Sequence, residues 1–436
     1  MDAKTRPCRP RGKIPGLAAL AVPAALATVA AQAQLLPDVF PPAVPGYGTD
    51  PGVTVQTRAR PEFDSLGTRI GGALVHAQIE QSVGFDSNVT GGAQGRGGWL
   101  FRTSPSVLVS STARRDPYGL YVSLDNTRYP GLPNQNQTDW TAGGGATIAV
   151  GEDGLTLGAA HLSLHQAPGD LDALPTDQPV AYQVDDARLG YAHALGRLTL
   201  EPSLDVAAWR FGGATIQGVP ASQSYRNRDI IQGGLTMRYE LAPQRDLVLA
   251  LRGADQLYIA TPTGAVSPDS RSVTVLAGIE TIDGLWRYRL LAGYERRGFE
   301  AGAYRPHGAV VAEADAIFTP GGMTTVTASL VRNIEDAAQE GVAGYTYTGG
   351  TLTIDYEWQR DVLLQASAGA QRADLLGGGA QTVLRTGIGA TWLVNRRVRV
   401  TGTYGFGDTR ATGGGASGLS GSFTRSLGLL TVRLGL

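Results

Sequence analysis

The sequence is poor in cysteine, in charged residues and in long apolar runs. Its single cysteine, Cys8, precedes the one long apolar stretch, so it is not placed for lipid attachment. Removal of that N-terminal region would leave a chain without thiols, which excludes disulfides and thiolate chemistry. Charged residues make up 17% of the chain and the mean hydropathy is −0.08. These values exclude a bundle of membrane-spanning helices, which would show several apolar runs of about 18 or more residues.

Lysine is also nearly absent. Lys4 and Lys13 are the only lysines, so every later basic residue is an arginine. Without residues 1–33 the chain carries 32 basic and 37 acidic residues, a net charge of −5. Genomic base composition would account for this bias, and so would selection of arginine for a polar lumen. No basic patch indicates a nucleic-acid partner.

The N-terminus has the three parts of a secretory signal. Five basic residues precede an apolar stretch from Ile14 to Ala31, and Ala31-Gln32-Ala33 is a small-residue cleavage site. We therefore predict a signal peptide at 1–33. A permanent helical anchor is the alternative, which Pro15 and Pro23 disfavour.

The next segment, residues 34–71, is rich in proline and glycine, a composition typical of extended and poorly ordered chain. It is interpreted as a periplasmic tail, a partner-binding arm or a plug of the lumen. From residue 72 to 436 the chain follows one rhythm, which we assign to a single β-barrel domain.

Within that domain apolar and polar residues alternate over segments of roughly ten to sixteen residues. Leu247, Leu249 and Leu251, for example, are separated by Val248 and Ala250 and followed by Arg252. Successive side chains of a strand point to opposite faces, so each such strand has one apolar and one polar face. The length of the segments suits strands that cross a membrane, which need about nine to eleven residues.

Short and long connections alternate strictly between these segments. This binary order predicts an all-β, closed antiparallel transmembrane barrel with short periplasmic turns and longer extracellular loops. The count is eighteen strands, with sixteen as fallback, and both termini lie in the periplasm. The short links lie at 114–116, 151–154, 196–197, 243–246, 282–284, 319–322, 359–361 and 395–397. The long links lie near 87–97, 130–137, 167–179, 213–222, 261–269, 300–306, 335–345, 374–380 and 409–419.

Four aromatic residues fall at the predicted periplasmic rim on the lipid-facing parity: Trp286, Phe318, Trp358 and Trp392. Such a level of aromatics is typical of the interfacial girdle of a membrane barrel. The pattern therefore predicts a location in the outer membrane of a Gram-negative bacterium.

Residues with catalytic potential are scarce. His161 and His165 are four apart on a strand, about 13 Å along it, which is too far for one metal ion. No nucleophile elbow or ordered Ser/His pair is evident, so we predict no enzyme, no catalytic residue, no metal and no cofactor. Inward-facing charges are the candidate pore lining, either as an ion-pair ladder that stiffens the barrel or as a charged constriction that selects solutes. They are Arg226, Arg228, Arg238, Arg252, Arg287, Arg289, Arg297, Asp205, Glu313, Asp315, Asp355 and Glu357.

Two short motifs carry a resemblance. Gly84-Phe85-Asp86-Ser87-Asn88 closes the first strand, and Ser224-Tyr225-Arg226-Asn227-Arg228-Asp229 opens a long strand that runs to Pro243. With the overall pattern of 73–436, they make the chain resemble the outer-membrane β-barrel porins found beside exopolysaccharide genes in proteobacteria. The resemblance implies polysaccharide export or another pore activity. The partners it implies are outer-membrane lipid, the barrel assembly machinery and a polysaccharide or export-system component.

The function expected is therefore an outer-membrane pore for passive transport of solutes or passage of an exopolysaccharide. A structural or assembly barrel with a plugged lumen is the alternative, and a surface hydrolase is a third class. An arginine-rich wall on the eighth and eleventh strands, facing acids on flanking strands, would give an open lumen a transverse field.

Overall fold

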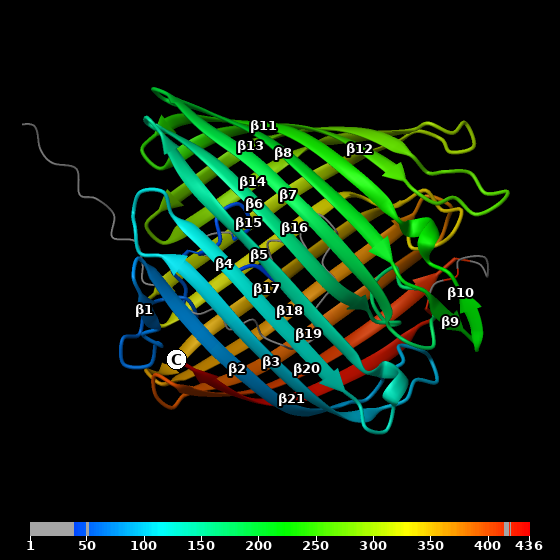
Figure 1. Cartoon of the computed structure of the whole chain (residues 1–436), viewed down its shortest axis with the longest axis horizontal. Helices are drawn as coiled ribbons and strands as arrows, with labels where there is room; N and C mark the ends of the chain where they lie inside the picture. The colour runs from blue at the N-terminus through cyan, green and yellow to red at the C-terminus, as the bar shows by residue number, and fades with distance from the viewer. Residues whose placement is uncertain (1–38, 49–51, 414–417, 419) are drawn as a thin grey trace, which may run out of the picture.

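A computed structural model describes residues 39–48, 52–413, 418 and 420–436 as a closed antiparallel barrel (Figure 1). The predicted fold class and the count of eighteen strands are confirmed, and the predicted signal peptide lies outside the described residues. The barrel closes where the last strand pairs with the first, from Gln78↔Gly435 to Asp86↔Leu427. The strands are β2 (Ala73–Asp86), β3 (Gly98–Ser111), β4 (Tyr118–Arg128), β5 (Gln137–Val150), β6 (Asp153–Gln166), β7 (Val180–Leu195), β8 (Leu198–Phe211), β11 (Arg228–Ala242), β12 (Arg245–Tyr258), β13 (Ser270–Asp283), β14 (Trp286–Phe299), β15 (His307–Gly321), β16 (Thr324–Glu335), β17 (Tyr345–Gln359), β18 (Val362–Leu375), β19 (Ala380–Leu393), β20 (Val398–Thr412) and β21 (Phe423–Gly435).

Short elements decorate this barrel at both ends. At the turn end, β1 (Thr68–Ile70) pairs with the start of β2, so three residues of the predicted Pro-rich segment join the sheet. At the loop end lie a small hairpin of β9 (Ala214–Ile216) and β10 (Val219–Ala221) and the 3-10 turns η2 (Pro133–Gln135) and η3 (Ser224–Arg226). In the described part of the chain no helix is long and apolar enough to cross a membrane.

The predicted order of short turns and long loops holds with two corrections. Ser224–Arg226 is a 3-10 turn rather than the opening of a strand, and the strand starts at Arg228. The last loop begins after Thr412 rather than near residue 409, because β20 continues into the first residues of the expected link. In both segments the mixture of polar and apolar residues is compatible with a strand and with an ordered loop. The sequence pattern therefore does not show at which residue the strand begins or ends.

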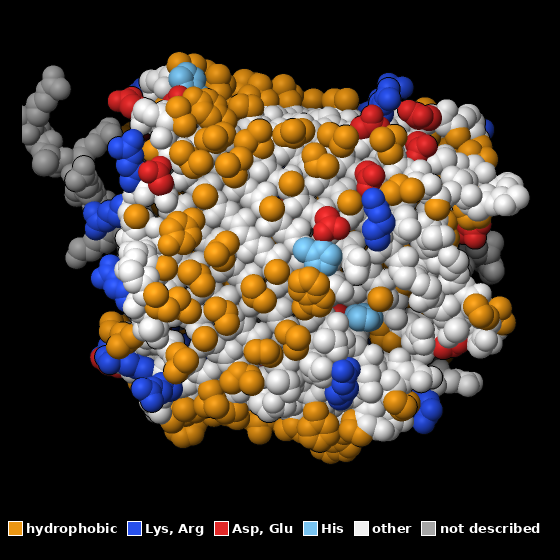
Figure 2. Space-filling view, viewed as in Figure 1, with side chains coloured by type: hydrophobic (Ala, Val, Ile, Leu, Met, Phe, Trp, Pro, Cys, Tyr) orange, Lys and Arg blue, Asp and Glu red, His pale blue; other side chains and the backbone are white. Residues whose placement is uncertain are grey.

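The two faces of the wall differ as the alternation requires. Leu247, Leu249 and Leu251 are 44%, 36% and 37% exposed and face outward, whereas Val248 and Ala250 between them are buried. Figure 2 shows apolar side chains spread over this outer surface, with basic side chains gathered at the turn end. Such a surface requires a lipid environment, because this much exposed apolar area is unfavourable in water.

The aromatic residues of the turn end lie where the sequence predicts them. Trp286, Trp358 and Trp392 are exposed on the outer face, and Trp286 stacks on Phe318 with ring centroids 4.2 Å apart. Amphipathic rings favour the headgroup level of a bilayer. This girdle therefore marks one border of the membrane-spanning band.

Candidate functional site

The candidate site is the inner wall of the barrel, where charged side chains from neighbouring strands meet. In its middle, Glu313 on β15 accepts a hydrogen bond from Nη2 of Arg252 on β12 at 3.1 Å. Nη2 of Arg289 on β14 lies 3.9 Å from the same carboxylate, and Asp315 lies opposite Arg289 in the strand register. Arg252 and Arg289 are each 32% exposed at the side chain, so these ions retain contact with solvent.

A second group of ion pairs lies beside the first. Arg238 on β11 contacts Glu201 on β8, and its Nε lies 3.4 Å from Oε2 of Glu280 on β13. Asp205 on β8 lies 2.6 Å from Nε of Arg188 on β7. These four arginines, at positions 188, 238, 252 and 289, thus do not form a separate basic wall, because each lies beside an acid on a nearby strand. The arrangement matches the ion-pair ladder more closely than the predicted transverse field.

Three of the predicted pore-lining arginines lie deep within a network at the loop end. Nε of Arg228 is 2.9 Å from Oδ2 of Asp336, and Nη1 of Arg297 is 2.7 Å from Oδ1 of the same residue. Arg226 lies over the ring of Phe211, 3.9 Å from its centroid. All three arginines are buried. Arg228 and Arg297 fix the 336–344 loop to the wall through Asp336, and loss of that carboxylate would leave buried charges without this partner.

Loops from several sides meet over the outer mouth. Asp172 in the 167–179 loop accepts a hydrogen bond from the amide of Ala338 at 2.7 Å, while its own amide donates to Gln381 on β19. The Tyr225 hydroxyl donates to the Ala338 carbonyl at 2.6 Å. Residues from opposite parts of the wall are thereby joined across the lumen. A pocket of about 630 Å³ remains among these loops.

Asp172 has an unusual electrostatic environment. Burial raises its pKa to about 7, against the hydrogen bond from Ala338 and the positive charge of Arg226, which both lower it. The nearby charge of Asp336 raises it further. The contact between the 167–179 and 336–344 loops is therefore sensitive to pH near neutrality.

At the turn end the N-terminal segment contacts the predicted acids of β17. Nη2 of Arg60 lies 2.7 Å from Oε2 of Glu357, which Arg58 also contacts. The Gln56 amide donates to Asp355 at 3.2 Å. Burial and the neighbouring charge of Arg58 lower the pKa of Arg60 to about 10.

Apolar contacts hold the same segment to the wall. Val55 packs with Leu363 and Leu393, and its amide donates to Oγ1 of Thr325 at 2.9 Å. Gly52 adopts a positive φ of 68° and lies so close to Arg287 and Ile317 that a Cβ would come 3.1 Å from Cδ1 of Ile317. The predicted pore-lining residue Arg287 therefore lies against the N-terminal segment rather than in open lumen.

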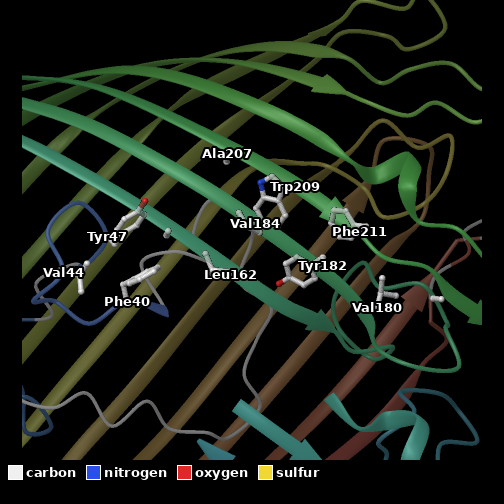
Figure 3. Packing of buried hydrophobic residues seen from close by; sticks show 12 residues of the cluster. Phe40, Val44, Tyr47, Leu162, Val180, Tyr182, Val184, Ala207, Trp209 and Phe211 are labelled. Carbon is white, nitrogen blue, oxygen red and sulfur yellow. The ribbon is translucent and has the colours of Figure 1, made fainter. Parts of the chain in front are cut away.

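A group of aromatic side chains on the inner face was not identified from the sequence. Tyr182 stacks on Trp209 and Phe211 with centroid distances of 5.9 Å and 5.5 Å. Figure 3 shows Phe40 and Tyr47 of the N-terminal segment beside these strands, in the same apolar cluster. The parity of Trp209 and Phe211, between the outward Ala208 and Arg210, is the signal that could have placed them inside.

The histidines of β6 do not come together. Nδ1 of His161 lies 2.6 Å from Asp185, and Nδ1 of His165 lies 2.6 Å from Asp139. Within the described ranges, no group of three or more His, Cys, Asp or Glu residues is arranged to hold a metal ion.

Comparison with known proteins places the chain in a family. Residues 60–434 match the model of the family described as Putative beta-barrel porin 2. No curated protein matches the sequence significantly.

Solved structures of outer-membrane proteins resemble the barrel. The outer membrane protein OpdK from Pseudomonas aeruginosa is 12% identical, with 83% of this chain and 99% of that chain covered and a TM-score of 0.44. OccK2 (OpdF) from the same organism, in complex with glucuronate, is 12% identical, with 84% and 98% covered and a TM-score of 0.47. OccAB2 from Acinetobacter baumannii is 10% identical, with 85% and 99% covered and a TM-score of 0.45.

Proposed function

This chain belongs to the β-barrel porin 2 family of the outer membrane, and we propose that it conducts small solutes passively through its lumen. The observation that carries the proposal is the set of partly solvent-exposed charges at mid-height of the inner wall, above all Arg252, Arg289 and Glu313. Ionised groups are stable inside a barrel when both partners and water are available. An eighteen-stranded barrel is wide enough for an aqueous channel unless something fills it.

The contacts at both ends favour small solutes over a polymer. The N-terminal segment is fixed to β17 at the turn end, and loops are joined across the lumen at the other end. An exopolysaccharide, which the family resemblance suggests as cargo, would require both sets of contacts to open. We therefore propose small solutes first and passage of a polymer second.

A structural barrel with a filled lumen is the alternative from a different class. It is favoured by one observation, the packing of Phe40, Val44 and Tyr47 against the inner side of β6–β8 (Figure 3). The described residues 39–48 and 52–66 would then act as a permanent plug. The proposal of transport requires instead that a path past them exists or opens.

Conductance in planar bilayers distinguishes a pore from a structural barrel. The purified mature protein should give ohmic steps, and Arg289→Gln should shift ion selectivity toward cations, because Glu313 and Asp315 are then less neutralised. The matched control is Arg271→Gln, an outward arginine that is 71% exposed and should leave selectivity unchanged. Arg297 is left intact because it is paired with Asp336 in the buried network.

The pore proposal is refuted if the inserted protein shows no conductance. A protein that inserts correctly yet shows no conductance, both as the mature chain and after deletion of residues 34–71, would refute the pore and support the structural barrel. Conductance that appears only after the deletion would show that the segment is a closed plug in the resting state. Competition of the current by an added acidic polysaccharide, with no effect of small sugars, would favour the polymer.

A further inference from the structure

The outer face of the barrel carries a row of arginines that the transport proposal does not use. Arg332 on β16, Arg372 on β18 and Arg410 on β20 lie in one register row, separated by Thr348 on β17 and Thr382 on β19. Each arginine is two or three residues from the loop end of its strand. We define these five residues as the Arg–Thr row.

The Arg–Thr row faces outward, toward lipid. Side chains alternate along a strand, and Arg410 shares the parity of the exposed Tyr404 and Phe406. Arg372 and Arg410 are 51% and 68% exposed. An outward arginine at the middle of a bilayer costs about 2–4 kcal/mol, whereas near the interface it costs about 0–1 kcal/mol. The row therefore lies at the headgroup level of the outer leaflet.

The row is a continuous line of hydrogen-bond donors. Nη1 of Arg332 donates to Oγ1 of Thr348, and Nη1 of Arg372 donates to Oγ1 of Thr382 at 3.3 Å. Adjacent strands are about 4.8 Å apart, so successive arginines are roughly 10 Å apart, with a hydroxyl between them. This spacing leaves room for an anionic group between two guanidinium groups.

Two carboxylates accompany the row and orient its arginines. Nη2 of Arg372 lies 2.6 Å from Oδ1 of Asp374, and Nη2 of Arg410 lies 2.7 Å from Oδ2 of Asp408. Nε of Arg332 donates to the carbonyl of Val310 at 3.1 Å, and no carboxylate of the described residues lies within ion-pair distance of it. The group keeps a net charge of +1. Exposed pairs of this kind contribute little stability by themselves, so the guanidinium groups remain available to a stronger anion.

Similar arginines occur on other strands that rise toward the loop end. Arg128 on β4, Arg210 on β8 and Arg296 on β14 share the outward parity and the position near the strand end. Only between β16 and β20 do the arginines fall in the same row on every second strand of the described barrel. The row is thus the densest part of a wider basic border, on the rim opposite to the aromatic girdle.

From this arrangement we infer that the Arg–Thr row binds the phosphate groups of anionic glycolipids in the outer leaflet. Guanidinium groups recognise phosphate through paired hydrogen bonds, and threonine hydroxyls supply further donors. Basic residues at a membrane surface each contribute to binding of anionic lipid. This inference goes beyond transport, because it concerns how the barrel is held in its membrane.

Binding of diphosphorylated lipid A to the purified barrel in neutral detergent tests the inference. The comparison ligand is the same lipid with both phosphates removed. We expect the wild-type protein to bind the phosphorylated form at least about tenfold more tightly, and Arg372→Gln/Arg410→Gln to lose most of that preference. The matched control, Arg245→Gln/Arg360→Gln, removes two exposed, ion-paired arginines at the turn end and should keep it.

Two results would refute a phosphate site on the Arg–Thr row. One is equal binding of both lipids by the wild-type barrel, which requires no variant to fold. The other is an unchanged lipid preference in the Arg372→Gln/Arg410→Gln protein. If the oligomeric state of that protein changes while its lipid preference is kept, the row is a contact between copies of the chain. Conductance should be the same in both double variants. The lipid-binding result therefore does not depend on whether the transport proposal is correct.

Discussion

The assignment of faces can be tested by moving one charge across the wall. Leu249 on β12 is exposed on the lipid side and pairs with Met237 and Ala277 in the register. Three residues further along, Arg252 faces inward and binds Glu313. Leu249→Arg places a charge in lipid, whereas Arg252→Leu removes a charge from the lumen.

The two substitutions differ strongly in expected free energy of unfolding. Leu249 lies near the middle of the apolar band, where an arginine costs a barrel about 2–4 kcal/mol, or roughly 30- to 1,000-fold in the folding equilibrium. Arg252→Leu removes a pair whose side chains are about a third exposed, so the loss should be at most about 1 kcal/mol. Arg289 remains beside Glu313 and limits that loss.

The assay is reversible folding into lipid vesicles, followed by denaturant titration and by the shift of the folded band on unheated gels. Leu249→Ala is the control for the loss of the leucine side chain itself. The reasoning fails if Leu249→Arg and Arg252→Leu unfold at the same denaturant concentration, because that result would mean that the two residues do not face different solvents.

Two further predictions concern the closures at the ends of the lumen. Glu357→Gln should release the N-terminal segment, because Arg58 and Arg60 lose their shared carboxylate at a cost of about 1–3 kcal/mol. Limited proteolysis within residues 52–66 should therefore become faster. The control Glu62→Gln removes only an exposed partner of Arg360 and should leave the proteolysis rate unchanged. Asp172 has a pKa of about 7 in the folded protein against an ordinary value of 3.8, so protonation of its carboxyl stabilises the folded loop contact. This stabilisation is complete below about pH 4 and declines as the pH rises to about 7. Hydrogen exchange at the Ala338 amide, corrected for intrinsic rate, should therefore show protection that falls over this range in the wild-type protein and stays level in Asp172→Asn; a level wild-type profile would contradict it.

Much of the barrel follows from the sequence because its signals are local. The period of two in segments such as Leu247–Arg252 gives the strands and their faces, and the alternation of short and long links gives the closed antiparallel order. The membrane border is predictable in the same way from Trp286, Trp358 and Trp392. The side of the strand on which each tryptophan lies and its distance from a turn both follow from its position in the sequence. The strand boundary at Ser224–Arg226 was wrong, because turn and strand share that composition.

The division into 1–33, 34–71 and 72–436 and the role of the pore-lining set stay predictions. The sequence places Arg226, Arg228 and Arg297 on the inward parity but does not show that Asp336, from a loop, reaches two of them. Nor does it show that Glu357 meets Arg58 and Arg60, nearly 300 residues away. Such partners depend on how the barrel closes and where loops fold, which no local pattern records.

That the chain crosses the outer membrane as an eighteen-stranded barrel can be predicted from the sequence, because the bilayer requires each strand to satisfy its backbone within the sheet and to face lipid with every second residue. The folded barrel is needed to show which charges meet inside it and how the N-terminal segment and the loops contact its wall. It is also needed to show that three arginines from alternate strands share one outer row. Strand register and loop contacts join residues distant in sequence, and the energies of these contacts depend on positions that only closure of the barrel fixes.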